Sequence, residues 1–417
     1  MKKITNKKKI FWLVVLCSIV YVISYVTRIN YAAVLVEVVD SEGYSKVAAS
    51  MALTGLFITY AVGQLLNGYL GDKIKPEKMV LAGLLLAAGM NLLMPLCTTV
   101  TQMTVVWCIN GFAQSMLWPP IVKIMTSRLT NEMYKKTVIY VGWGSSIGTI
   151  VVYSMAPVVL ISFPWRAVFF IAAALAIVMA VIWALTIHKI QPDTEIDPGH
   201  DPSAVQVGKS HVPFTKKAIY IIVLSMVGIA MQGALRDGIA TWMPSFVSEV
   251  FSADNSTAIL TGVALPILSM IVSALTSWIN RKWLKNEGLC AGVMFVVCVV
   301  SSVALYFTRS ASPVAAVAFL ALANAASHGI NLIYTCLILP IFHRFGKISF
   351  MSGLLNSATY VGSSLSMYGI AFITESFGWN MTILTWLLVS VVGAVACFST
   401  IGALDSFKKE DPTLENA

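Results

Sequence analysis

Residues 10–36, IFWLVVLCSIVYVISYVTRINYAAVLV, form an apolar run that contains one full charge, Arg28. A run of about 20 apolar residues is long enough to cross the hydrocarbon core of a bilayer as a helix. A charged side chain at that depth costs about 2.5–3.5 kcal/mol on insertion scales, so such a residue is rarely kept without a function. The seventh apolar run, 217–248, contains Arg236, 208 positions after Arg28. Two arginines at matching places predict a duplicated membrane protein with an anion site between its halves.

The composition excludes a soluble globular domain. The chain of 417 residues is 58% hydrophobic and 11% charged, with a mean hydropathy of +0.81, whereas soluble domains carry about 25% charged residues. Spans this apolar must be helices, because lipid offers no partner to backbone polar groups. The sequence predicts an all-α polytopic membrane protein with twelve transmembrane helices in two pseudo-symmetric six-helix bundles. The spans are expected near 10–36, 47–71, 79–97, 102–125, 137–162, 165–188, 217–248, 256–279, 289–307, 313–342, 349–374 and 379–403.

The net charge of +9 is a signal of topology rather than of a nucleic-acid partner. Most of the 28 lysines and arginines fall in the two termini and in alternate loops, while Lys46, Arg166 and Arg309 fall in the opposite loops. Cytoplasmic loops carry the excess of positive charge in membrane proteins. We therefore expect a multi-pass protein of the cell (plasma or inner) membrane with both termini in the cytoplasm.

A long polar segment divides the chain. Residues 189–216, KIQPDTEIDPGHDPSAVQVGKSHVPFTK, are rich in proline and mixed charge, and such a composition cannot bury a core. It is predicted to be a cytoplasmic linker between bundles 1–188 and 217–417. The halves echo each other, since Asn324 falls over Asn110 at nearly the offset of the arginines. Internal repeats with a midplane site between them are a transporter architecture.

The loop GQLLNGYLGDKIKPEKM (63–79) resembles the loop between helices two and three of the major facilitator superfamily. Its glycines favour close helix packing. The matching loop of the second half contains Asn280-Arg281-Lys282. The resemblance implies a gating role on the cytoplasmic side for Asp72, Lys73 and Arg281.

Further segments are similar to the organophosphate:phosphate antiporters of that superfamily, the group of glycerol-3-phosphate and hexose-6-phosphate transporters. The segments are YVISYVTRINYA (21–32), NGFAQSMLWPP (110–120), LRDGIATWMP (235–244) and, more weakly, SATYVGSS (357–364) with ITESFGWN (373–380). The resemblance implies that Arg28 and Arg236 bind phosphate, for which the planar guanidinium is suited. It also implies that aromatic residues line the cavity, namely Tyr21, Tyr25, Tyr60, Trp118 and Tyr360. Tyr21, Tyr25 and Arg28 share one helical face by their spacing of four and three residues.

An acid stands next to the second arginine. Asp237 is the one acid well inside a span, and neighbours on a helix point about 100° apart. We therefore expect that Asp237 does not easily share a face with Arg236. Even with that pair formed, one arginine would remain uncompensated.

Four positions depart from the resembled family. Gln64 stands where a cavity lysine is expected, and Ser145 stands where the glycerol-3-phosphate branch has a histidine. Gly233 and Gly329 replace expected tyrosines. The predicted pocket thus has one fewer positive charge and more space, which favours a larger phosphorylated ligand or a less charged anion such as a phosphonate or carboxylate.

His328, Asn324 and Asn331 form a polar stripe on one face of the tenth span. The interpretations left open for His328 are a ligand to a sugar hydroxyl, a group that titrates in proton coupling, and a buried histidine that bonds its own helix. The sequence contains no phosphate-binding loop, dinucleotide fingerprint, metal-ligand cluster or nucleophile with a base. We expect no cofactor, no metal site and no enzymatic activity.

The resemblance favours a transporter that exchanges a phosphorylated metabolite for inorganic phosphate by alternating access. The expected partners are a small anionic substrate, phosphate and the bilayer, with the monomer as the working unit. Three alternatives remain at this level. They are a carboxylate or hexuronate symporter driven by a cation, a transporter-like sensor of phosphate esters, and a drug exporter, for which intramembrane acids are scarce.

Overall fold

The computed structural model describes residues 2–70, 74–195, 215–309, 311–338, 341–342 and 348–409. The chain forms two compact units, one of residues 1–34 with 58–206 and one of residues 35–57 with 207–417. Most of the predicted linker 189–216 and the predicted gating residues Asp72 and Lys73 lie outside the described residues. The boundaries predicted for the two bundles stay a prediction.

In its described residues, the first unit is helical apart from turns and one short antiparallel pair of strands, β1 (Lys2–Lys3) and β2 (Thr194–Glu195). Several of its helices begin at a side chain that accepts a backbone N–H bond, which satisfies a donor that the helix leaves free. Asn6 does this for α1 and Thr99 for α5. The helices are α1 (Lys7–Ala33), the later part of α3 (Lys46–Leu70), α4 (Pro76–Leu93), η1 (Met94–Leu96), α5 (Val100–Ser115), α6 (Trp118–Arg128), α7 (Asn131–Gly142), α8 (Gly144–Leu160), α9 (Arg166–Thr186) and η2 (Ile187–Lys189).

The Trp-Pro-Pro step breaks the predicted span 102–125 into two helices. Helix α5 ends at Ser115 and α6 begins at Trp118, with Pro119 and Pro120 in its first turn. Proline is favourable there because the first turn leaves its N–H positions unbonded. A similar break separates α7 from α8 at Trp143.

Glycines bring α1 and α8 into close contact. A Cβ atom on Gly148 would lie 2.6 Å from the carbonyl of Val22 and 2.7 Å from the Cβ of Tyr25. One on Gly144 would lie 3.2 Å from the Cβ of Tyr21. The segment GWGSSIG thus packs helices together, and it holds the tyrosine-bearing face of α1.

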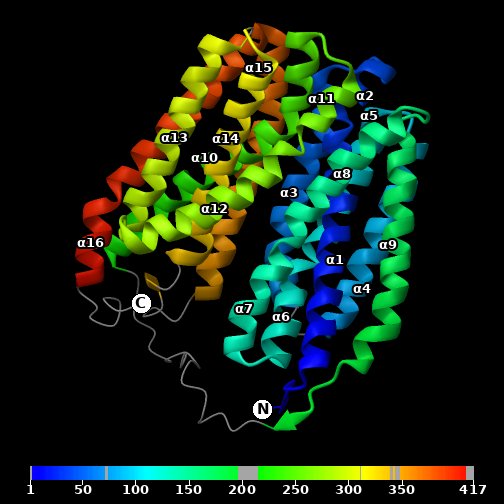
Figure 1. Ribbon diagram of the computed structural model, residues 1–417, viewed down its shortest axis with the longest axis vertical. Coiled ribbons are helices and arrows are strands. Elements are labelled where there is room, and N and C mark those ends of the chain that lie inside the picture. Colours follow the sequence, from blue (N-terminus) through cyan, green and yellow to red (C-terminus); the bar gives the residue numbers. More distant parts are fainter. Residues whose placement is uncertain are drawn as a thin grey trace. The chain divides into compact units, whose positions relative to one another are not determined.

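The second unit contains the remaining helices. Within it, α10, α13, α14 and α15 lie side by side (Figure 1). Helix α15 covers the predicted span 349–374 and most of the predicted span 379–403, and the two parts meet at Gly378 with a φ of 76°. The helices are α2 (Leu35–Glu42), the first part of α3, α10 (Lys216–Phe251), α11 (Asn255–Thr261), α12 (Ala264–Lys282), α13 (Glu287–Thr308), α14 (Pro313–Leu332), the π-helix η4 (Ile333–Leu337), α15 (Ile348–Ser399) and α16 (Ile401–Lys409).

Within the described part of the chain, 10 helical stretches are long and apolar enough to cross a membrane. One of them, Met351–Lys409, contains the two spans that meet at Gly378. The fourth predicted span does not qualify by length because it is divided into α5 and α6. These two features account for the difference from twelve predicted spans.

Candidate anion-binding site

In the first unit the predicted residues come together around Arg28. Its side chain is buried, and the guanidinium carbon lies 4.4 Å from the ring centre of Tyr60 and 5.5 Å from that of Tyr25. Such contacts stabilise a guanidinium through the ring quadrupole. The aromatic chain continues, since the ring of Tyr21 lies 5.2 Å from Tyr25 and 4.5 Å from Trp118. Three helices, α1, α3 and α6, therefore build one aromatic and cationic surface.

The two polar substitutions of the first half lie on α3 and α8. Gln64 is half-buried one turn after Tyr60. The hydroxyl of Ser145 donates to the carbonyl of Gly142 at 2.8 Å, across the break between α7 and α8. This bond satisfies the Ser145 donor locally, so a ligand role for Ser145 stays a prediction without added support.

A buried amide network braces α1 beside Arg28. Asn91 and Asn110 each donate to the carbonyl of Thr27 at 3.0 Å. Gln114 donates to the hydroxyl of Thr27 at 2.9 Å, and Asn30 donates to Asn91 at 2.7 Å. Buried amides are costly unless bonded, so the network fixes the backbone that carries Arg28. Sequence reasoning used Asn110 only in the repeat and in the segment 110–120 that carries the resemblance, although polar residues in apolar spans were the available signal.

In the second unit Arg236 has the same kind of aromatic neighbour and an acid in addition. Its guanidinium carbon lies 5.8 Å from the ring centre of Tyr360. Its Nε and Nη2 atoms donate to the two carboxylate oxygens of Asp237 at 2.9 and 2.8 Å. The expectation that Asp237 does not share a face with Arg236 is therefore wrong. The 100° offset applies to the Cβ directions, whereas the long arginine side chain bends round to its neighbour.

Residues from α14 and α15 hold this pair. Ser363 donates to the Asp237 carboxylate at 2.6 Å. Asn324 donates to the carbonyl of Arg236 at 2.7 Å, as Asn110 donates to the carbonyl of Thr27 in the first unit. The repeat seen in the sequence thus has a structural meaning, because each half uses an asparagine to bind the backbone at its arginine.

The polar stripe on α14 continues from Asn324 to His328 and Asn331, both half-buried. His328 lies close enough to Arg236 and Asp237 for both charges to act on it. A direct ligand role for His328 stays a prediction.

The two glycines that replace expected tyrosines do not open the pocket. A Cβ on Gly233 would overlap the carbonyl oxygen of Thr359, and one on Gly329 would overlap the hydroxyl of Thr276. The space of the missing side chains is taken by neighbouring helices. The prediction of extra space at these positions is therefore wrong. The glycines instead allow α10 to pack closely on α15 and α14 to pack closely on α12.

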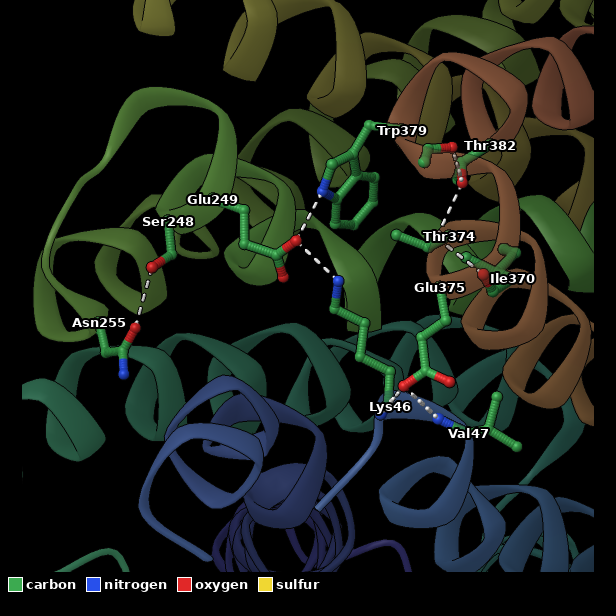
Figure 2. Close-up of polar contacts among 11 residues, drawn as sticks. Lys46, Val47, Ser248, Glu249, Asn255, Ile370, Thr374, Glu375, Trp379 and Thr382 are labelled. Carbon is green, nitrogen blue, oxygen red and sulfur yellow. Dashed lines mark hydrogen bonds and ion pairs between the residues drawn. The ribbon is translucent and has the colours of Figure 1, made fainter. Parts of the chain in front are cut away.

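A cluster that sequence reasoning missed joins α3, α10 and α15 (Figure 2). We call Lys46, Glu249, Glu375 and Trp379 the Lys46 cluster. The ammonium of Lys46 lies 2.6 Å from the carboxylate of Glu249 and 5.3 Å from the ring centre of Trp379, whose indole donates to Glu249 at 2.9 Å. Glu375 accepts from the backbone N–H groups of Lys46 and Val47 at the start of α3.

Of the predicted gating residues, Arg281 lies exposed in the last turn of α12.

A buried arginine within apolar membrane helices marks a candidate functional site. A family model described as the Major Facilitator Superfamily matches residues 17–367. The chain belongs to this superfamily.

Known proteins agree with this assignment. The glycerol-3-phosphate transporter of Bacillus subtilis (strain 168) is 25% identical over 310 residues, which are 69% of this chain and 68% of that protein. The membrane sensor protein UhpC of Escherichia coli (strain K12) is 22% identical over 384 residues, or 86% of this chain and 85% of that one. A solved structure of a bacterial homologue of the human lysosomal transporter Spinster aligns with a TM-score of 0.82 and 14% identity, covering 96% of this chain and 99% of that one.

These matches confirm the predicted all-α fold of twelve transmembrane helices and the resemblance to organophosphate:phosphate antiporters. The protein is a multi-pass membrane transporter and not an enzyme.

Proposed function

We propose that the protein exchanges a phosphorylated metabolite for inorganic phosphate by alternating access. We place it in the plasma membrane with both termini in the cytoplasm, because positive charge is concentrated in the termini and alternate loops. The observation that carries the proposal is the buried Arg28, which lies beside two tyrosine rings and follows Thr27, a residue bonded by two amide side chains at its carbonyl and by a third at its hydroxyl. A fixed guanidinium presents paired donors in the geometry of a phosphate group.

The surroundings of Arg28 support an organic phosphate as the ligand. The rings of Tyr21, Tyr25 and Trp118 follow one another beside the guanidinium. Apolar and aromatic walls with a few placed polar groups are typical of small-molecule sites. Arg28 would bind the phosphate, and the aromatic surface would pack against the organic part.

Arg236 is the proposed second phosphate ligand, with Tyr360 beside it. Its ion pair with Asp237 compensates part of the positive charge of Arg236. A ligand shifts a conformational equilibrium only by its differential affinity for the two states. In our proposal the closed state binds the anion best because it engages both arginines.

Gln64 and Asp237 favour a second candidate, a carboxylate symporter driven by a cation. Both residues lower the positive charge of the site, which suits an anion with fewer charges. The similarity to UhpC keeps a phosphate-ester sensor as a further outcome of the test.

Counterflow in liposomes distinguishes these candidates. The purified protein is reconstituted with phosphate inside, and entry of labelled phosphate, hexose phosphates and hexuronates is measured. The proposal predicts entry of phosphate and of at least one ester only when phosphate is inside. Entry of a carboxylate into phosphate-free vesicles, driven by a proton or sodium gradient, would support the symporter instead. Binding of an ester without any entry would identify a sensor.

A further inference from the structure

The carboxylate of Asp237 covers one edge of the Arg236 guanidinium, the edge formed by Nε and Nη2. Both carboxylate oxygens are bonded, to Nε at 2.9 Å and to Nη2 at 2.8 Å. Paired parallel bonds of this kind are also the geometry in which arginine binds phosphate. A ligand that binds this edge of Arg236 must therefore displace Asp237.

Displacement leaves the carboxylate in an unfavourable place. The side chains of Arg236 and Asp237 are only 13% and 17% exposed. A buried charge that loses its partner is strongly destabilised, and such a group neutralises itself where it can. For a carboxylate, neutralisation means taking up a proton.

Ser363 provides a place for that proton. Its hydroxyl oxygen lies 2.6 Å from the Asp237 carboxylate and 3.0 Å from the carbonyl of Thr359. In the present structure the hydroxyl donates to the carboxylate. A hydroxyl both donates and accepts, so it can accept from a protonated Asp237 while it donates to Thr359.

Other groups also act on the charge of Asp237. Among the described residues, the titratable and charged side chains near this pair include His328 on α14, which acts on both Arg236 and Asp237, and Tyr360 on α15, whose ring lies beside Arg236. Arg236 stabilises the ionised carboxylate while the pair is intact. Once an anion binds Arg236, the negative charge of that anion further favours the protonated form of Asp237.

We propose that Asp237 is an internal counter-ion of Arg236, that the anionic group of the ligand displaces it, and that it takes up one proton from solution as it is displaced. The proposal rests on the proposed function, because it takes Arg236 as a phosphate ligand. In the step, the ion pair opens, an O–H bond forms on Asp237, and two guanidinium N–H groups bond to the ligand. When two anions are exchanged, the protons carried in opposite directions cancel. Proton uptake can therefore be measured when a ligand binds, but it does not appear in net exchange.

The test is calorimetry of inorganic phosphate binding to the full-length protein in two buffers of different ionisation enthalpy. The buffer dependence of the heat gives the number of protons taken up. The protonation of phosphate itself changes equally in all variants. A difference in proton uptake between variants therefore comes from the protein. Asp237→Asn keeps the size and one acceptor, and we expect it to take up fewer protons, by a difference approaching one. We also expect this variant to bind phosphate about tenfold tighter at pH 7.5, because the carboxylate that competes for Arg236 is gone. A tenfold change in affinity corresponds to about 1.4 kcal/mol.

Two further variants make the result decisive. Asp405→Asn removes a carboxylate on α16 that accepts a hydrogen bond from Asn286 at 2.6 Å. The proton uptake of this variant should equal that of the unchanged protein. Ser363→Ala removes a donor from the ionised carboxylate and an acceptor from the protonated one, and the bond to the charged form is the stronger of the two. This variant should therefore still take up the proton and should not bind phosphate more weakly than the unchanged protein. Equal proton uptake by Asp237→Asn and the unchanged protein overturns this inference and leaves the proposed function intact. No phosphate binding by the unchanged protein overturns both.

Discussion

Replacing Lys46 by methionine tests whether the Lys46 cluster holds α3 against α10 and α15. Methionine keeps the length and apolar stem of the side chain and removes its charge. The ion pair with Glu249 has exposures of 14% and 39%, so it is worth about 0.2–1 kcal/mol. The contact with Trp379 adds about 0.5–1 kcal/mol. The expected loss is about 1–2 kcal/mol, or a factor of roughly 5–30 in the equilibrium between packed and separated helices.

Hydrogen exchange measured by mass spectrometry on residues 35–57 reports this equilibrium. Lys46→Met should speed exchange in that segment by the same factor of about 5–30, because separation exposes its backbone. Lys136→Met is the matched control, since its partner Glu132 forms an ion pair with exposures of 64% and 78%, and it should change nothing there. Exchange in residues 35–57 that is the same in Lys46→Met as in the unchanged protein would refute the role of the cluster.

Three further predictions concern packing and charge. Gly233→Ala should lower the melting temperature, because the new Cβ meets the carbonyl of Thr359 and overpacking costs about 1–3 kcal/mol. Gly369→Ala is the control and should leave the melting temperature unchanged, because the space around its Cβ is open. Gln64→Lys should tighten phosphate binding measured by calorimetry, since it adds a positive charge one turn after Tyr60, and weaker binding would contradict the placement of the site. Asn110→Ala should weaken phosphate binding, since a buried hydrogen bond is worth about 0.5–1.5 kcal/mol, and unchanged affinity would show that bracing the α1 backbone does not matter.

Local patterns and the family resemblance together predicted the residues around Arg28. The spacing of Tyr21, Tyr25 and Arg28 predicts one helical face, the resemblance added Tyr60 and Trp118, and in the structure Tyr60 lies beside Arg28 and Trp118 beside Tyr21. Helix periodicity carries this information because it depends only on neighbours along the chain.

Contacts between distant residues could not be predicted in this way. The space beside Gly233 is filled by Thr359, and Lys46 meets Glu249, which is 203 positions away. Nothing in the local sequence selects those partners. The Arg236–Asp237 pair was missed for another reason, because a helical wheel describes Cβ directions and not the reach of a long side chain.

Self-exchange of labelled phosphate in phosphate-loaded liposomes tests the central claim, that Arg28 binds the transported anion. Arg28→Lys keeps the charge but loses the paired donors of the guanidinium. Arg166→Lys is the control, since Arg166 bonds the carbonyl of Pro95 at 3.1 Å, away from the site. We predict that exchange is lost in Arg28→Lys and retained in Arg166→Lys. Exchange by Arg28→Lys at the rate of the unchanged protein would contradict the claim.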